Sequence, residues 1–128
     1  MFSCRHCVGR VLVDGHDLRM TNPSFTTIAE GVEMGVLRRH EGQGMTFLIR
    51  MQPGSRAPRH NHPGGEETYM LEGRLRICER VSAGGEAEPD LVLAAGEYGF
   101  VPPGEKHEGI AEGVTRFLVV APAGVSRT

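Results

Sequence analysis

The sequence contains few cysteines, few aromatic residues and no long apolar run. Its 128 residues include three cysteines, two tyrosines, five phenylalanines and no tryptophan. Three cysteines are too few for the disulfide framework of a small secreted domain, and their number is odd. We therefore expect the protein to lie in a reducing compartment, the cytoplasm. The longest mainly apolar stretch, residues 117–121, is far shorter than the roughly 20 residues that cross a bilayer. Residues 1–10 also lack an apolar segment as long as those of secretory signals.

The chain carries no large excess of charge of either sign. Lysine and arginine total 14 and aspartate and glutamate total 16, which gives a net charge of −2 with neutral histidine. This balance is a poor electrostatic match for a phosphate backbone or an anionic membrane surface. We therefore expect neither nucleic acid nor a membrane as a partner.

Glycine and proline, by contrast, are abundant. The 18 glycines and 8 prolines make up about a fifth of the chain, against a usual level of roughly 12%. Their scatter indicates many tight turns between short strands. Strand-like segments lie between them at residues 32–38, 45–51, 67–71, 75–81, 91–93, 99–101 and 117–121. No segment keeps a helical spacing of apolar residues over three turns, so we expect an all-β sandwich or barrel with little helix.

Some strand residues have alternative roles. Met45–Met51 is apolar almost throughout, which is typical of a strand buried on both faces. Its one charged residue, Arg50, either points into the barrel, where it would bind an anionic substrate, or pairs with a carboxylate. Tyr98 and Phe100 either line a pocket or pack in the core.

The first 20 residues differ from the rest, and we expect a boundary between an N-terminal segment (1–20) and a single barrel domain (21–128). Residues 1–20 are either an arm that packs on the domain, with residues 11–13 as an edge strand, or an extension that precedes it. Cys4 and Cys7 have the spacing of half a structural zinc site, but no second Cys-x-x-Cys pair follows. We expect that these two cysteines do not bind zinc.

The clearest chemical signal is a pair of histidines, His60 and His62. On an extended strand, positions i and i+2 share a face, so both imidazoles can reach one ion. Glu66 follows across Pro63-Gly64-Gly65, a sequence that permits a sharp turn, and its carboxylate can fold back toward the histidines. Two imidazoles and a carboxylate are typical ligands of Zn, Fe, Mn, Ni or Cu. Glu67 could replace Glu66 if the turn were one residue longer.

The spacing around this pair resembles the first motif of the cupin family. That motif has a glycine, five residues, His-x-His, three or four residues, a glutamate, six residues and a glycine. Here the matching positions are Gly54, His60, His62, Glu66 and Gly73. The motif glutamate stands seven positions before the last glycine, which selects Glu66 over Glu67. Glu67 would then be a solvated or neighbouring carboxylate on the opposite face of the strand, and a weak candidate for a catalytic base.

A second stretch is similar to the second cupin motif, which has a glycine, five residues, Pro-x-Gly, two residues, a histidine, three residues and an asparagine. The matching residues here are Gly96, Pro102, Gly104 and His107. Ala111 stands where the motif has asparagine, which is a departure in a turn and not in the ligand set.

The resemblance implies a fold and a metal site. The fold would be a double-stranded β-helix (jelly roll), a conical barrel of two antiparallel sheets. His60, His62, Glu66 and His107 would hold one divalent transition metal per chain, with one or two positions left open for other ligands.

The same resemblance implies several activities. The local sequence is most similar to the metal-sensing cupins of anti-sigma factors and to small cupin dioxygenases. We expect a metal-dependent oxygenase that acts on a small organic molecule. The alternatives are a non-catalytic sensor of a metal or small ligand, and an isomerase or sugar-binding cupin. The family also implies a homodimer.

Overall fold

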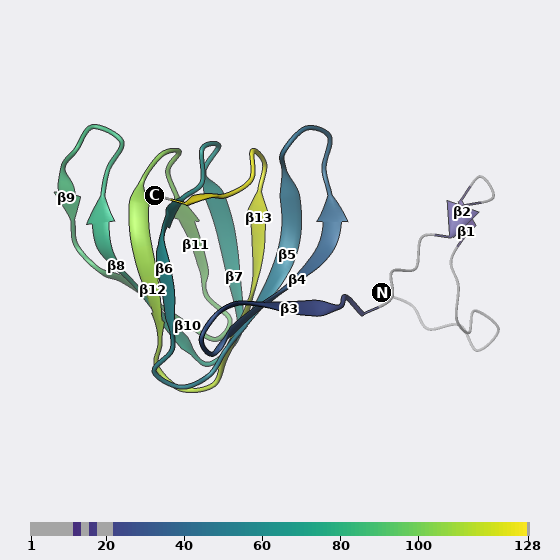
Figure 1. Ribbon diagram of the computed structural model, residues 1–128, viewed down its shortest axis with the longest axis horizontal. Helices are drawn as coiled ribbons and strands as arrows, with labels where there is room; N and C mark the ends of the chain where they lie inside the picture. The colour runs from purple at the N-terminus through teal and green to yellow at the C-terminus, as the bar shows by residue number, and fades with distance from the viewer. Residues whose placement is uncertain (1–11, 14–15, 18–21, 128) are drawn as a thin grey trace.

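A computed structural model of the chain describes residues 12–13, 16–17 and 22–127, and it contains only strands and their connections in these residues (Figure 1). The described part of the chain has no helix that could span a membrane. The predicted all-β fold with little helix is therefore confirmed.

Twelve of the strands form two antiparallel sheets of six strands each. One sheet has the order β11-β7-β13-β5-β4-β3. Its strands are β11 (Tyr98–Val101), β7 (Glu66–Glu72), β13 (Thr115–Ala121), β5 (Met45–Met51), β4 (Val32–Arg39) and β3 (Phe25–Ala29). The other sheet has the order β10-β8-β12-β6-β14, with β9 also paired to β8. Its strands are β10 (Leu91–Ala94), β8 (Arg74–Val81), β12 (Lys106–Ala111), β6 (Arg56–Asn61), β14 (Ser126–Arg127) and β9 (Ala87–Glu88).

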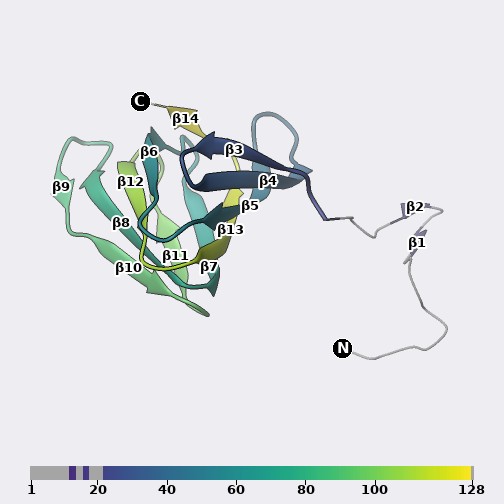
Figure 2. The ribbon, with the colours of Figure 1, turned by 60° about the horizontal axis from the view of Figure 1, so that its bottom comes forward.

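The two sheets face each other as the walls of a barrel that narrows toward one end (Figures 1 and 2). Side chains alternate along each strand, so every second residue points between the sheets. The buried core consists of these inward residues. Its largest fully buried apolar side chains are those of Met51, Met70, Val32, Val101 and Val119. This is the conical two-sheet barrel that the resemblance implied.

The strands predicted from the sequence all occur, with ends shifted by one or two residues. One prediction about them is wrong, because β5 is not buried on both faces. Phe47 and Ile49 are buried, while Leu48 is half-buried and Arg50 is exposed.

The N-terminal residues yield one short hairpin. Strand β1 (Leu12–Val13) pairs with β2 (His16–Asp17) in a two-stranded sheet of its own. Leu12 and Val13 thus form a strand, as predicted, but its partner is not an edge of the barrel. Cys4 and Cys7, and with them the question of a zinc half-site, lie outside the described residues.

Candidate metal centre

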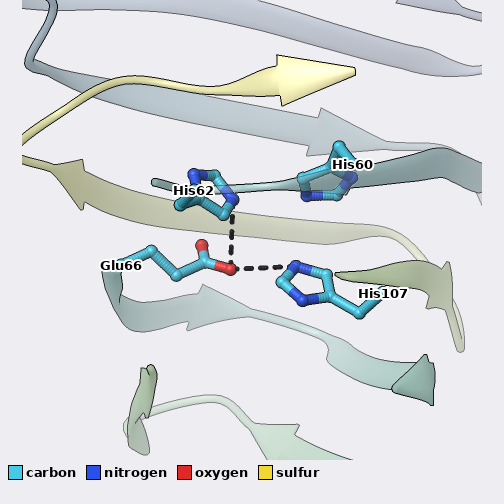
Figure 3. A group of neighbouring side chains, drawn as sticks. All are labelled: His60, His62, Glu66 and His107. Atoms are coloured by element: carbon cyan, nitrogen blue, oxygen red, sulfur yellow. Dashed lines mark ion pairs between the residues drawn. The ribbon is translucent and has the colours of Figure 1, made fainter. Parts of the chain in front are cut away.

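The four predicted ligands come from both sheets and meet inside the barrel (Figure 3). His60 lies on β6 and His107 on the adjacent β12, and the two residues are direct partners in the strand register. His62 follows the end of β6, and Glu66 is the first residue of β7 in the opposite sheet. The register therefore brings two imidazoles together, and the β6–β7 connection supplies the carboxylate.

The turn between His62 and Glu66 determines where the carboxylate lies. Gly65 has a φ of 82°, in the left-handed region that favours glycine, and its N–H donates to the carbonyl of His62 at 2.8 Å. The N–H of Gly104, in the turn before β12, donates to the same carbonyl at 3.1 Å. The carbonyl of His62 thus accepts hydrogen bonds from the turns of both sequence motifs.

The donor atoms have the separations expected of ligands to one ion. One ligand atom from each of the four residues lies within 4.8 Å of every other. Glu66 Oε1 is 3.2 Å from Nε2 of His62 and 3.1 Å from Nε2 of His107. Two ligand atoms each about 2.1 Å from a shared ion, at angles of about 90–110°, lie about 3.0–3.4 Å apart. The cluster could hold a metal ion.

The hydrogen bonds of the histidines leave a nitrogen of each ring available. Nδ1 of His60 lies 2.7 Å from the carbonyl oxygen of Pro58, which can only accept, so that nitrogen carries the proton and Nε2 has the free lone pair. Nδ1 of His107 lies 3.2 Å from Glu105 Oε2, with the same consequence. Neither ring nitrogen of His62 has a hydrogen-bond partner among the described residues, although the residue is only 3% exposed. Buried orphan nitrogens that face a carboxylate are what a metal ion would satisfy.

Charge in the cluster also favours a bound cation. Burial opposes ionisation of Glu66, but the neighbouring imidazoles of His107 and His62 outweigh it and hold the pKa of Glu66 well below its usual range. Burial, and then the nearby His107, lower the pKa of His60 to about 4. At neutral pH the carboxylate is therefore ionised and His60 is neutral, which are the forms that bind metal.

A second buried carboxylate, Glu105, supports His107 from behind. Glu105 is 2% exposed and accepts two hydrogen bonds from Arg80, from Nε at 2.9 Å and from Nη2 at 2.8 Å. Arg80 also donates to the carbonyl of Pro89 at 2.7 Å. Carboxylates that accept from a metal-binding histidine fix its tautomer and ring orientation.

A bulge in β8 turns Arg80 toward this position. The pairing between β8 and β12 shifts by one residue between Lys106 and Glu108, and Glu79 has a φ of 53°. The extra residue breaks the alternation of β8, so Cys78 is buried and Arg80 reaches Glu105. The sequence analysis named neither Arg80 nor Glu105 as a site residue.

One side of the cluster opens into a cavity of about 310 Å³. His60, His62 and Glu66 line one part of its wall, and the rest of the lining is apolar. A much smaller void of about 40 Å³, bounded in part by His107 and Thr68, lies at the cluster as well. The larger cavity is at the lower end of the range for small-molecule sites, about 300–1,000 Å³.

Other residues singled out from the sequence lie away from the cluster. Glu67 is exposed on the outer face of β7 and accepts a hydrogen bond from the Tyr98 hydroxyl at 2.8 Å. It therefore cannot serve as the candidate catalytic base, because strand alternation directs it away from Glu66. Tyr98 and Phe100 are 57% and 54% exposed, so the prediction that they line a pocket or fill the core is wrong. Arg50 also points outward, where it pairs with Glu33 at 3.0 Å and lies over the ring of Phe25.

Comparison with known proteins supports this architecture. The sequence matches the family model described as ChrR Cupin-like domain over residues 14–123. No curated protein matches the sequence.

Several solved structures share the fold. An RmlC-like cupin from Shewanella frigidimarina is 22% identical, with a TM-score of 0.62, and the match covers 79% of this chain and 85% of that one. A chain from the crystal structure of Rhodobacter sphaeroides SigE in complex with the anti-sigma ChrR is 22% identical, with a TM-score of 0.61 and coverage of 76% and 47%. A mutant of the Bacillus subtilis oxalate decarboxylase OxdC is 20% identical, with a TM-score of 0.65 and coverage of 84% and 30%. At these identities the likeness shows the fold alone.

Proposed function

The chain belongs to the family of ChrR Cupin-like domains, and on that premise we propose that it is a metal-dependent oxygenase that acts on a small organic molecule. One divalent transition metal, Fe, Mn, Ni, Zn or Cu, would be held by the three imidazoles of His60, His62 and His107 and the carboxylate of Glu66. The observation that supports this most directly is that this cluster of available donor atoms lies at the wall of a cavity large enough for a small molecule.

The metal, when bound, would polarise an oxygen of the substrate and, if it is iron, would also activate dioxygen. Three nitrogen ligands and one carboxylate leave one or two open positions on a metal ion that takes five or six ligands. The apolar walls of the cavity would exclude water from the reacting centre.

The residues around the cavity restrict the reaction class. Among the described residues that line it, the titratable side chains are His60, His62 and Glu66, which are all metal-ligand candidates. The cavity therefore supplies no separate general base. A substrate that loses its proton on binding the metal, such as a phenol or an enolisable diketone, fits this arrangement better than one that needs proton abstraction at a distant carbon.

The family also supports a second candidate function, that of a sensor without catalysis. The sequence is similar to a chain of a complex between a sigma factor and the anti-sigma ChrR, and the match spans 47% of that chain. In this alternative the metal or a small ligand would change the affinity for a partner protein. An isomerase or sugar-binding role is less well supported, because sugars need polar groups around the ring and the cavity walls are apolar.

Metal analysis followed by oxygen-uptake measurements would test the proposal. We expect about one transition-metal ion per chain and, for the iron-loaded protein, oxygen uptake with at least one member of a panel of small phenols and diketones. The matched controls are Glu66→Gln, which changes the cluster, and Glu67→Gln, which changes the next carboxylate on the outer face of β7. Absence of metal from the wild-type protein would overturn the oxygenase and the metal sensor, and would leave only a sensor of a small ligand. Bound iron with no uptake on any substrate would overturn the oxygenase and leave the sensor.

Two finer expectations remain predictions, namely a homodimer and a cytoplasmic location. Light scattering on the purified chain would test the first, and a monomer at micromolar concentration would contradict it. Fractionation of the cells that make the protein would test the second.

A further inference from the structure

The walls of the large cavity differ sharply from its metal-binding part. The lining includes apolar side chains from both sheets and from the segment before β14. These residues are Ile28, Val32, Met34, Met45, Phe47, Ile49, Ala57, Pro58, Phe117, Val119 and Val125. Apart from the cluster, no lining residue among those described carries a polar or charged side chain. Among the described residues, a molecule in this cavity therefore meets polar side chains at one place only.

Among the described residues that line the cavity there is no lysine or arginine to pair with a second negative charge on the ligand. Arg50, which follows Ile49 on β5, is directed outward to Glu33 and Phe25. A second carboxylate, or the ring of hydroxyls on a sugar, would lose its water and gain no partner.

The cavity also limits the size of the ligand. A volume of about 310 Å³ corresponds to about ten water-sized groups, at the roughly 30 Å³ that each water occupies in the liquid. The void of about 40 Å³ that His60 and Glu66 also line holds no more than about one such group. The body of the ligand must therefore lie in the larger cavity.

We propose that the site takes small molecules with a single metal-binding oxygen group, an apolar alkyl or aryl body of up to about ten non-hydrogen atoms, and no second charge. The oxygen group would be a carboxylate, hydroxamate, phenolate or enolate. This specificity rests on the proposed metal-dependent function. In this proposal the apolar walls, and not the ligands of the metal, determine which small molecules bind.

A homologous series of inhibitors tests the proposal without turnover. The zinc-loaded protein would be titrated calorimetrically with acetohydroxamate, butanohydroxamate and hexanohydroxamate, and with oxalate. Affinity is expected to rise about three- to fourfold for each methylene that the cavity buries, and oxalate is expected to bind more weakly than hexanohydroxamate. An affinity that does not change with chain length, or tighter binding of oxalate, would overturn the proposal.

A pair of variants on one strand locates the effect. Met34 on β4 lines the cavity, whereas Glu33, its neighbour, pairs with Arg50 on the outside. Met34→Gln keeps the length of the side chain but places an amide in the wall. Met34→Gln is expected to weaken the affinity for hexanohydroxamate at least tenfold and to change the affinity for acetohydroxamate less than twofold. Glu33→Gln is expected to change neither affinity. Equal losses for both hydroxamates in Met34→Gln would contradict the assignment of the apolar wall.

A metal-free experiment separates this proposal from the function on which it rests. The chelated protein would be titrated with 1-hexanol and with glycerol, and binding would be followed by NMR shifts of the methionine methyl groups. Saturable shifts with hexanol and none with glycerol would support the apolar cavity even if the protein proved unable to hold a metal. No saturable shift with hexanol would overturn the proposal while the metal site could still stand.

Discussion

Two buried carboxylates, Glu66 and Glu105, lie on either side of His107 and differ in what neutralises them. Glu105 is held by the guanidinium of Arg80 through two hydrogen bonds of 2.8 and 2.9 Å. Glu66 is 6% exposed, and its ion-pair partners among the described residues are the imidazoles of His62 and His107, with no lysine or arginine. Both groups are removed from water, but only Glu105 has a permanent cation supplied by the chain.

The difference indicates two different roles. A buried charge without a partner costs several kcal/mol, so proteins either pair it or bind a metal with it. The Arg80–Glu105 pair is complete in itself and orients His107. The Glu66 site becomes complete only when a cation from outside the chain enters it.

The largest effect is expected from removing the charge of Glu66. Glu66→Gln takes away the one anionic ligand, so metal binding should be lost almost entirely, and elemental analysis after dialysis would show it. Zinc at 1,000 times its dissociation constant should stabilise the wild type by about 4 kcal/mol in urea unfolding and the variant not at all.

Glu67→Gln is the control for this experiment, since Glu67 is the adjacent carboxylate and lies on the outer face of the same strand. It should bind metal as the wild type does. Equal metal content in Glu66→Gln and Glu67→Gln would show that Glu66 is not a metal ligand. The contrast drawn between Glu66 and Glu105 would then be wrong.

The sequence predicts Glu66 and not Glu105 for a physical reason. Spacing within a hairpin carries information about which side chains share a face, so His60, His62 and Glu66 could be grouped from the chain itself. The match to a second motif added His107, and the structure brings all four together. The seven strand segments named from the sequence were equally predictable, because turn residues bound each of them, whereas β3 and β12 were not among them.

The Arg80–Glu105 pair depends on a bulge, and no residue type in the sequence marks it. Glu79 adopts its φ of 53° without being glycine or asparagine, so the break in β8 has no local signal. Glu105 stands in a turn sequence with Gly104 and Lys106, where a solvated carboxylate is the usual outcome. The exposure of Tyr98 and Phe100 was missed for a different reason: they alternate with the buried Gly99 and Val101, and a strand of four residues does not show which of its two faces points inward.

The second largest effect is expected at the internal pair. Glu105→Ala leaves the partly buried guanidinium of Arg80 without its carboxylate partner and Nδ1 of His107 without its acceptor. Unfolding free energy should fall by about 3–5 kcal/mol, and metal affinity should fall about 10- to 100-fold. Urea unfolding and competition with a chelator would measure the two quantities separately.

Two further variants separate orientation of the ligand from general stability. Glu105→Gln keeps an acceptor for His107 and should recover part of the metal affinity that Glu105→Ala loses. Arg80→Met removes the cation but leaves the carboxylate beside His107, so it should cost stability with a smaller loss of affinity. If all three variants lost affinity in proportion to stability, Glu105 would be a structural residue only.

The smallest expected effect tests whether a proton on His60 can act as the missing cation of Glu66. The pKa of His60 is lowered to about 4, first by burial and then by His107, whereas an unfolded histidine has a pKa of about 6.5. Below pH 6.5 the unfolded chain therefore takes up a proton that the folded chain refuses, and stability is lost as the pH falls toward 4. Between pH 7 and pH 5 the free energy of unfolding of the metal-free protein should fall by about 2 kcal/mol, which urea unfolding in the presence of EDTA would measure.

His60→Gln has no imidazole at this position and should lose this component of the pH dependence. If the variant kept the same pH dependence, His60 would be protonated in the folded protein as well. Its positive charge would then neutralise Glu66, and the cluster would not require a metal.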